Sequence, residues 1–269
     1  MNARAPLYQA RYGSPDAPTP TAGSPVIDHL LAHRSVRAYL PDPVSDDTLT
    51  AIVAAAQSAA SSSNLHAWSV VAVRDPARKA RLAELAGDQE HIRQAPVLLV
   101  WLADLARLHD VATRVGESAA ALDYLEMFEV GVIDAALAAQ NAVTAAESLG
   151  LGTVYIGAMR NRPEDVAAEL QLPPRVVAVF GLCVGTPDPR HPAAVKPRPP
   201  QSVVLHQETY SLPAQQPGLA EYDTAMSTFY TSQGMKVRGT WSNHSAKRIR
   251  DADSLSGRDR LVEALRVLG

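Results

Sequence analysis

Apolar residues recur along much of the chain with the spacing of helices. In residues 26–33, Ile27, Leu30 and Leu31 share one face, which is the pattern of a helix with one buried side. Ser45 and the two acids after it form a typical helix beginning, because a hydroxyl caps the first turn and acids suit the positive end of the helix dipole. The pattern predicts helices over residues 26–33, 45–58, 76–86, 163–170 and 219–232, and a closing helix from about residue 259.

The longest helical pattern runs from about Ala119 to Leu149 and is apolar on most sides. A helix that is apolar all round must be covered all round, so we expect residues 132–146 to lie in a dimer interface. The stretch also carries Asp134 and Glu147, and a membrane helix would rarely hold two acids at such depth. The sequence therefore predicts a buried helix of a soluble protein.

Short apolar runs between the helices predict buried strands, over residues 68–73, 95–102, 153–156 and 176–184. Helices and strands together indicate a mixed α and β domain. Residues 1–25 are rich in Pro, Gly and Ser, lack the apolar core of a signal peptide, and are expected to form an irregular leader. Residues 26–269 are expected to form one domain, with a C-terminal excursion over about 187–269 that begins in a proline-rich stretch.

Composition narrows the function classes. Of the 269 residues, 46% are hydrophobic and 20% are charged, which is ordinary for a globular protein. The net charge of −3 argues against a general nucleic-acid-binding protein, because neutralising phosphates needs a clustered excess of Lys and Arg. The single cysteine, Cys183, excludes an intramolecular disulfide and a cysteine metal cluster. We expect a cytoplasmic protein with no membrane or nucleic-acid partner and no metal site.

Familiar catalytic motifs do not occur in the sequence. It has no Gly-x-Gly-x-x-Gly after a strand, no phosphate-binding Gly-x-x-x-x-Gly-Lys, no His-Glu-x-x-His and no Gly-x-Ser-x-Gly. An enzymatic function then requires a cofactor that brings the reactivity.

Four short clusters have the side chains that such a cofactor needs. His33-Arg34-Ser35-Val36-Arg37 offers two guanidinium groups, an imidazole and a hydroxyl to an anion, and Lys196-Pro197-Arg198 adds two cations. Ser61-Ser62-Ser63-Asn64 offers hydroxyls, and Tyr155-Ile156-Gly157-Ala158 lets a flat ligand approach the backbone. Taken singly, the first three are typical of solvated surface or of a helix-ending turn, and the fourth is as typical of strand-to-loop packing. Together they match a phosphorylated, polyol-linked, flat heteroaromatic cofactor, and FMN fits that description.

Longer motifs follow one another in a distinctive order. They are His33-Arg34-Ser35-Val36-Arg37, residues 142–157 (AVTAAESLGLGTVYIG), Phe180-Gly181-Leu182-Cys183-Val184-Gly185, Lys196-Pro197-Arg198 and Thr240-Trp241-Ser242. In this order they resemble the larger, NADPH-preferring group of the nitroreductase family, from about Asp28 to Gly269. The resemblance implies an α+β, nitroreductase-like sandwich with a mixed central sheet flanked by helices, in an intertwined homodimer with two FMN sites at the subunit interface.

The resemblance also implies the residues of the FMN site. Arg37 would lie near the pyrimidine edge, where a positive charge stabilises the anionic reduced flavin. Gln89 would read the polar edge of the ring. The phosphate would face a cationic cradle made of His33, Arg34, Ser35, Lys196 and Arg198. The other implied flavin contacts are Ser61, Ser63, His91, Tyr155 and, through their backbone near the reactive ring nitrogen, Ile156, Gly157 and Ala158.

Three positions depart from the family pattern. Ala158 replaces a common second glycine and narrows the approach to the ring, and Asn64 replaces an aromatic residue over the substrate pocket. The arginine that grips the 2′-phosphate of NADPH in relatives is Gln233 here. Lys236 and Arg238 lie in the same loop as substitutes, so NADPH is the expected donor and NADH the alternative. The implied nicotinamide and substrate residues are Asn64, Lys236, Arg238 and Arg258.

The implied reaction is ping-pong transfer of an electron pair from NAD(P)H to the flavin and then to an acceptor, with no catalytic side chain. Nitroaromatics, quinones, free flavin and metal oxyanions are all open as acceptors. The main alternative is a store or redox sensor that binds FMN without significant turnover. A flavin-independent anion-binding protein is a more remote one.

Overall fold

The chain forms two structural units, each made of two separate stretches of sequence. The computed structural model describes residues 3–237 and 239–269. The sheet unit comprises residues 35–192 and 256–269, and the helical unit comprises the residues up to 34 together with 193–255. The expected leader and most of the expected C-terminal excursion therefore belong to the same unit, and only the closing residues return to the sheet unit.

A four-stranded sheet lies at the centre of the sheet unit. Its strands are β1 (Trp68–Val73), β2 (Val97–Asp104), β3 (Gly152–Ile156) and β4 (Val176–Gly185), in the order β1-β2-β4-β3. All neighbouring strands are antiparallel, and the expected mixture of strand directions is limited to one isolated parallel bridge, from Ser35 to Thr153. Every residue of β2 is buried, as expected for a continuous apolar run at the centre of a sheet. The predicted strands and the α+β class are confirmed.

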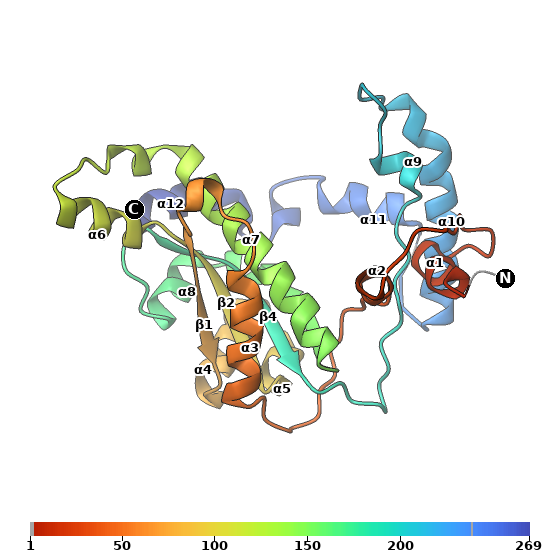
Figure 1. Cartoon of the computed structure of the whole chain (residues 1–269), viewed down its shortest axis with the longest axis horizontal. Helices are drawn as coiled ribbons and strands as arrows, with labels where there is room; N and C mark the ends of the chain where they lie inside the picture. Colours follow the sequence, from red (N-terminus) through yellow and green to blue (C-terminus); the bar gives the residue numbers. More distant parts are fainter. Residues whose placement is uncertain (1–2, 238) are drawn as a thin grey trace. The chain divides into compact units, whose positions relative to one another are not determined.

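The long helix α7 (Leu125–Ser148) packs on the sheet together with α3 (Asp46–Gln57), and Figure 1 shows the two helices side by side. Alanines line the buried face of α7, and their short side chains let the backbones come close. Trp101 of β2 and Ile52 of α3 fill the same core and have no exposed surface. The alanines of α7 in this core are Ala138, Ala139, Ala142 and Ala146.

The opposite face of α7 is open within the single chain, where Ile133 is 48% and Leu137 is 44% exposed. The expectation that residues 132–146 lie in a dimer interface is therefore wrong for the alanine face, because the chain's own sheet and α3 cover it. The sequence pattern treats every alanine as an apolar residue, so it places apolar residues on all sides of the helix. In the structure, only one face of the helix is packed in the core.

Shorter helices complete the sheet unit. The helix expected from Ala119 begins later, because a 3-10 turn, η2 (Ala120–Asp123), comes first and Tyr124 after it has an extended backbone. The helix α6 (Ala106–Val115) has no counterpart among the predicted ones. The other elements are α4 (Pro76–Leu85), α5 (Glu90–Gln94), α8 (Pro163–Glu169), α12 (Leu261–Leu268), η1 (Ser62–Asn64), η3 (Gly157–Arg160) and η6 (Arg258–Arg260).

The helical unit consists mainly of helices from the N-terminal stretch and from residues 193–255. They are α1 (Ala5–Tyr12), α2 (Pro25–Leu31), α9 (Gln201–Val204), α10 (Gln216–Ser232) and α11 (Trp241–Arg248), with 3-10 turns at η4 (Pro213–Gln215) and η5 (Asp253–Leu255). Tyr222 of α10 packs against Trp241 of α11, with ring centroids 5.1 Å apart. Its hydroxyl donates a hydrogen bond to the carbonyl of Pro197 at 3.2 Å, so the aromatic pair also anchors the proline-rich segment.

The leader is not wholly irregular, which corrects the expectation for residues 1–25. The helix α1 has a proline in its first turn and ends at Gly13, whose φ of 64° is the left-handed cap that glycine adopts most easily. Its buried residues are Tyr8 and Arg11. A buried cation thus stands where helical spacing would show an apolar residue, and this hides the helix from a hydrophobicity pattern.

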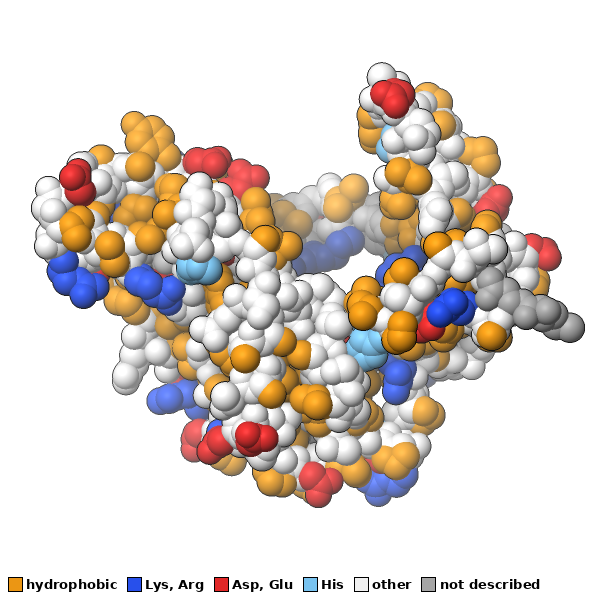
Figure 2. All heavy atoms as spheres, viewed as in Figure 1, with side chains coloured by type: hydrophobic (Ala, Val, Ile, Leu, Met, Phe, Trp, Pro, Cys, Tyr) orange, Lys and Arg blue, Asp and Glu red, His pale blue; other side chains and the backbone are white. Residues whose placement is uncertain are grey.

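Charged side chains are spread over the surface. Figure 2 shows Lys and Arg in small separate groups among acids on the face that it draws. In the described part of the chain, no helix has the length and apolar character needed to cross a membrane. Nor do the described residues contain a group of three or more His, Cys, Asp or Glu side chains that could hold a metal ion.

Candidate functional site

Two segments rich in cations meet in the helical unit. One follows α2 and ends in His33 and Arg34, and the other runs from Lys196 to Arg198. Arg11 contacts both, because its guanidinium donates hydrogen bonds to the carbonyls of His33 at 2.7 Å and of Lys196 at 3.0 Å. The main-chain N–H of Arg198 donates in turn to the carbonyl of Arg11 at 2.8 Å. The structure therefore brings together the predicted phosphate contacts of these two segments.

The cations of these segments are accessible, while the backbone between them is anchored. Arg34, Lys196 and Arg198 are exposed, whereas Pro197 is buried. Burial raises the pKa of Tyr222, and the positive charge of Arg198 partly opposes that rise. Tyr222 therefore keeps its proton at neutral pH and remains the donor that holds the carbonyl of Pro197.

The second half of the first cluster, Ser35 to Arg37, belongs to the sheet unit. The N–H of Val36 donates to the carbonyl of Thr153 on β3 at 2.8 Å, next to the parallel bridge at Ser35. Val36 is buried over Gly152, where a Cβ would come within 2.7 Å of its side chain. Glycine is needed at that position for the close approach. The pairing places Ser35 and Arg37 alongside β3.

The end of β3 carries the predicted backbone contacts. Tyr155 is 38% exposed, and its ring meets Phe180 edge-on with centroids 5.1 Å apart. Arg258, from the closing segment of the chain, donates to Oδ1 of Asn161 at 2.8 Å and so lies beside η3, the turn that follows β3. The predicted substrate residue Arg258 and the predicted backbone platform are therefore neighbours in space.

A half-buried arginine that the sequence pattern does not indicate lies in the same turn. Arg160 donates a hydrogen bond to the carbonyl of Val179 on β4, and burial lowers its pKa. Its guanidinium is 3.6 Å from the point where a Cβ on Gly157 would lie. The turn after β3 is thus fixed to the sheet by the side chain of Arg160. The spacing of hydrophobic residues does not predict a contact of this kind.

His91 has an unsatisfied polar atom. Its Nε2 is buried and has no hydrogen-bond partner among the described residues. Burial lowers the pKa of His91, and the positive charge of Arg37 lowers it further, so the imidazole is neutral at neutral pH. A neutral imidazole has one donor and one acceptor nitrogen, and the buried Nε2 is the one left without a partner. Gln89 nearby turns its side-chain amide to the carbonyl of Ala86, at 2.7 Å.

Asp134 of α7 holds the predicted serine turn. Its carboxylate accepts hydrogen bonds from the hydroxyl of Ser61 at 2.7 Å and from the N–H groups of Ser62 at 3.1 Å and Ala67 at 3.0 Å. The Ser61 hydroxyl also accepts from the N–H of His66 at 2.7 Å, and its one donor is already used on Asp134. In the sequence, Asp134 had indicated only that this helix does not cross a membrane. An acid inside an apolar helix was the available signal.

The outer part of this turn is strained. Ser63, Asn64 and His66 have φ values of 47°, 58° and 50°, a region that is costly for residues other than glycine. Ser63 and Asn64 are exposed, and Oδ1 of Asn64 lies 2.9 Å from Nε2 of His66. The bonds to Asp134 offset this strain and keep both predicted contacts at the surface.

The predicted nicotinamide residues are only partly described. Gln233 ends α10, with its main-chain N–H bonded to the carbonyl of Phe229 at 3.0 Å. Lys236 is exposed in the loop that follows. Arg238 lies outside the described residues.

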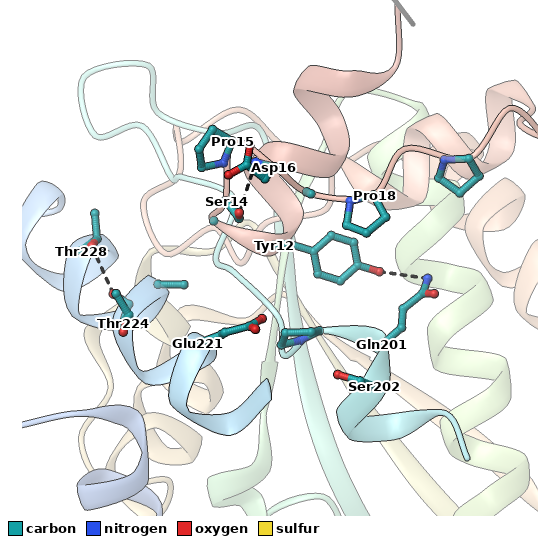
Figure 3. Close-up of a pocket in the computed structure, with 15 residues that line it drawn as sticks. Tyr12, Ser14, Pro15, Asp16, Pro18, Gln201, Ser202, Glu221, Thr224 and Thr228 are labelled. Atoms are coloured by element: carbon teal, nitrogen blue, oxygen red, sulfur yellow. Dashed lines mark hydrogen bonds between the residues drawn. The ribbon is translucent and has the colours of Figure 1, made fainter. Parts of the chain in front are cut away.

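A cavity of about 810 Å³ lies in the helical unit, between the turn after α1 and helices α9 and α10 (Figure 3). Tyr12 lines one side, where Nε2 of Gln201 donates to its hydroxyl at 3.2 Å. Two acids, Asp16 and Glu221, also line the cavity, and no Lys or Arg of the described chain does so. This lining disfavours a phosphate, so the cavity does not compete with the cation segments as an anion site.

Family membership follows from comparison with known proteins. The nitroreductase family model matches residues 30–186, and the model of the C-terminal domain of the nitroreductase family matches residues 196–269. The chain belongs to the nitroreductase family. It is therefore an oxidoreductase, as the resemblance implies. The helix α1 precedes the residues that this nitroreductase model covers.

Individual nitroreductase relatives cover most of the chain. An oxygen-insensitive NADPH nitroreductase of Salmonella typhimurium is 41% identical over 222 residues, which are 82% of this chain and 89% of the relative. An FMN reductase (NADPH) of Bacillus subtilis is 38% identical, over 81% of this chain and 88% of the relative. Among solved structures, the hypothetical oxidoreductase YcnD of Bacillus subtilis has a TM-score of 0.86 and 37% identity, covering 92% of this chain and 98% of that one.

The role of Asp134 in this chain predicts the effect of removing its charge. In Asp134→Asn the side-chain NH2 would face N–H donors, and at least one of the three hydrogen bonds would be lost. We expect the free energy of unfolding to fall by about 1–3 kcal/mol, the cost of leaving a buried polar group unpaired. Urea unfolding followed by circular dichroism measures this loss. Glu129→Gln, at an exposed position of the same helix, should match the parent, and equal stability of both variants would refute the assignment.

Proposed function

We propose that this chain is an FMN-dependent NAD(P)H oxidoreductase that reduces small organic acceptors such as nitroaromatics, quinones or free flavin. The observation that carries the proposal is the meeting of two cation segments in the helical unit, which exposes Arg34, Lys196 and Arg198. A dianionic phosphate suits such a set, because guanidinium groups fork onto phosphate oxygens. Relatives named FMN reductase (NADPH) and NADPH-flavin oxidoreductase, at 38% and 36% identity, support it.

Residues of the sheet unit fit the flat part of a flavin. His91 has a buried nitrogen open to a hydrogen bond, and Arg37 contributes a positive charge close enough to lower the pKa of that imidazole. Backbone at Gly157 and Ala158 follows the end of β3, where a ring nitrogen would need a donor. When bound, FMN supplies the redox chemistry, accepting hydride from nicotinamide and passing the electron pair to an acceptor in a separate half-reaction. The chain's own residues bind and orient the reactants.

Retention of FMN tests the cation segments. Each charge-assisted contact with the phosphate contributes about 1.5–3 kcal/mol, so Arg34→Ala or Arg198→Ala should weaken FMN binding by roughly ten- to a hundredfold. Titration of the apoprotein with FMN, followed by flavin fluorescence, measures the Kd. The fold should be unchanged in both variants, because the two side chains are exposed. Lys247→Ala, an exposed cation of α11, is the matched control and should bind FMN like the parent.

Three results would count against the residue assignments or the proposed function. A variant at either arginine that binds FMN as tightly as the parent removes that residue from the site. A parent that binds FMN but oxidises NADPH no faster when nitroaromatics, quinones or free flavin are added is a store or a sensor. A parent with no affinity for FMN is a flavin-independent protein.

We also propose that the chain works as a homodimer, as is typical of the nitroreductase family. The exposed apolar side chains of α7 support this, because Ile133 and Leu137 lie on the face that the single chain leaves open. Apolar side chains on an uncovered helix face are typical of a protein–protein contact. The buried alanine face of the same helix provides a control position for substitutions on the exposed face.

Acids on the two faces of α7 should therefore have different effects. Leu137→Asp should give a folded monomer, because it places a charge in the subunit contact. Ala142→Asp should unfold the chain, because an unpaired carboxylate in the core costs several kcal/mol. Light scattering gives the mass, and circular dichroism reports the fold. If Leu137→Asp stays dimeric at micromolar concentration, this face is not the contact.

The donor preference depends on the loop after α10. The 2′-phosphate distinguishes NADPH from NADH, and Gln233 has no charge to meet it. We infer a modest NADPH preference that rests on Lys236 and Arg238. Gln233→Arg should raise kcat/KM for NADPH by about tenfold and leave NADH unchanged, since a fork onto phosphate is roughly twice as strong as a neutral hydrogen bond. Gln233→Ala is the control, and an equal gain for both donors would contradict the inference.

A further inference from the structure

The helix α1 buries a guanidinium group that the proposed chemistry does not use. Arg11 is 7% exposed. Its Nη1 donates to the carbonyl of Lys196 at 3.0 Å, and its Nη2 donates to the carbonyls of Leu31 and His33, both at 2.7 Å. Burying a cation is costly unless its donors are satisfied, so this arrangement is tolerated only with the acceptors held in place. The rigid planar fork of arginine fixes the geometry of all three carbonyls at once.

The carbonyls that Arg11 holds belong to the two cation segments. His33 directly precedes Arg34, and Lys196 is two residues before Arg198. The carbonyl of Arg11 also accepts from the N–H of Arg198 at 2.8 Å, so side chain and main chain of one residue hold the second segment. The segments are about 160 residues apart in the chain, and Arg11 is hydrogen-bonded to both.

The turn after Arg11 is shaped for the same contact. Gly13 has a φ of 64°, and a Cβ on it would lie 2.9 Å from Cγ of Pro197. Any side chain there would push α1 away from the segment between Lys196 and Arg198. A second tie, from Nε of Arg4 to Oδ1 of Asp28 at 2.6 Å, joins α1 to α2. The helix is thus tied to α2 near its beginning and to the cation segments near its end.

We propose that Arg11 is a positioning residue for phosphate recognition: it fixes the backbone on which Arg34 and Arg198 converge on the FMN phosphate. The inference rests on the proposed function, because it assumes that these two arginines bind that phosphate. Fixing the segments beforehand removes the cost of ordering them when the cofactor binds. It also assigns a part in cofactor binding to α1, which lies outside the residues covered by both family models.

Comparison of FMN with riboflavin isolates this role, because the two ligands differ only in the phosphate. The Kd of each is measured by fluorescence titration of the full-length apoprotein, with thermal unfolding recorded in parallel. The parent should bind FMN much more tightly than riboflavin. In Arg11→Gln we expect the ratio of the two affinities to fall by about tenfold or more, the equivalent of one lost charge-assisted contact, with riboflavin affinity unchanged. Gln9→Ala, on the exposed side of α1, should keep the parental ratio.

Arg11→Lys provides a second test that keeps the buried positive charge but loses the planar fork. Its ratio should also fall, because one ammonium group cannot reach the three carbonyls in the same geometry. A folded Arg11→Gln with the parental ratio overturns the proposal. So does a parental ratio in Arg11→Lys if Arg11→Gln does not fold. A parent that binds FMN and riboflavin equally overturns the assignment of the phosphate site itself, which is a different failure.

Discussion

The close approach of α7 to the central sheet is the contact on which the sheet unit depends. Alanines of α7 meet β2 and α3 in a core that also encloses Trp101 and Ile52. Larger side chains on that face would separate the helix from the sheet and open voids around the tryptophan, which a close-packed interior does not tolerate. One turn closer to the N-terminus, the same helix holds the carboxylate of Asp134 against the serine turn. Core packing and site geometry therefore share one element.

The helical unit depends on polar contacts as well as on apolar packing. Arg11 is buried among main-chain carbonyls, and Tyr222 holds the carbonyl of Pro197 from the other side. Hydrogen bonds of this kind have directions, so they fix where a segment lies more sharply than apolar contact does. The two segments gain a defined backbone, while the side chains of Arg34, Lys196 and Arg198 remain exposed. An anion site needs both features, since attraction requires accessible charge and selectivity requires fixed positions.

Much of the fold was predictable because hydrophobic spacing reports burial directly. The strands, the helices from Ser45 and Pro163, and the long helix before Gly150 all follow from apolar periodicity and from helix-capping residues. The order of the motifs also indicated the nitroreductase family, which the family comparison shows. Hydrophobic periodicity did not predict α1, because a buried arginine takes an apolar position there. At α7 it did not show which face is buried, because alanines occur on several sides of the helix.

By itself, the sequence determined the residue types of the site, which are cations, hydroxyls and a turn of small residues. Each of these is recognisable from a short stretch of sequence. Only the tertiary structure decided which of them share a unit and what holds them. In the structure, Arg11 hydrogen-bonds to the carbonyls of both His33 and Lys196, and Ser61 donates a hydrogen bond to Asp134. The structure also leaves Nε2 of His91 without a hydrogen-bond partner among the described residues and places the ring where the charge of Arg37 lowers its pKa. These are single hydrogen bonds and charge effects between residues distant in the chain. Such contacts do not recur at a regular spacing, so a sequence pattern does not reveal them. They form only when the packed core has fixed the distances between the residues.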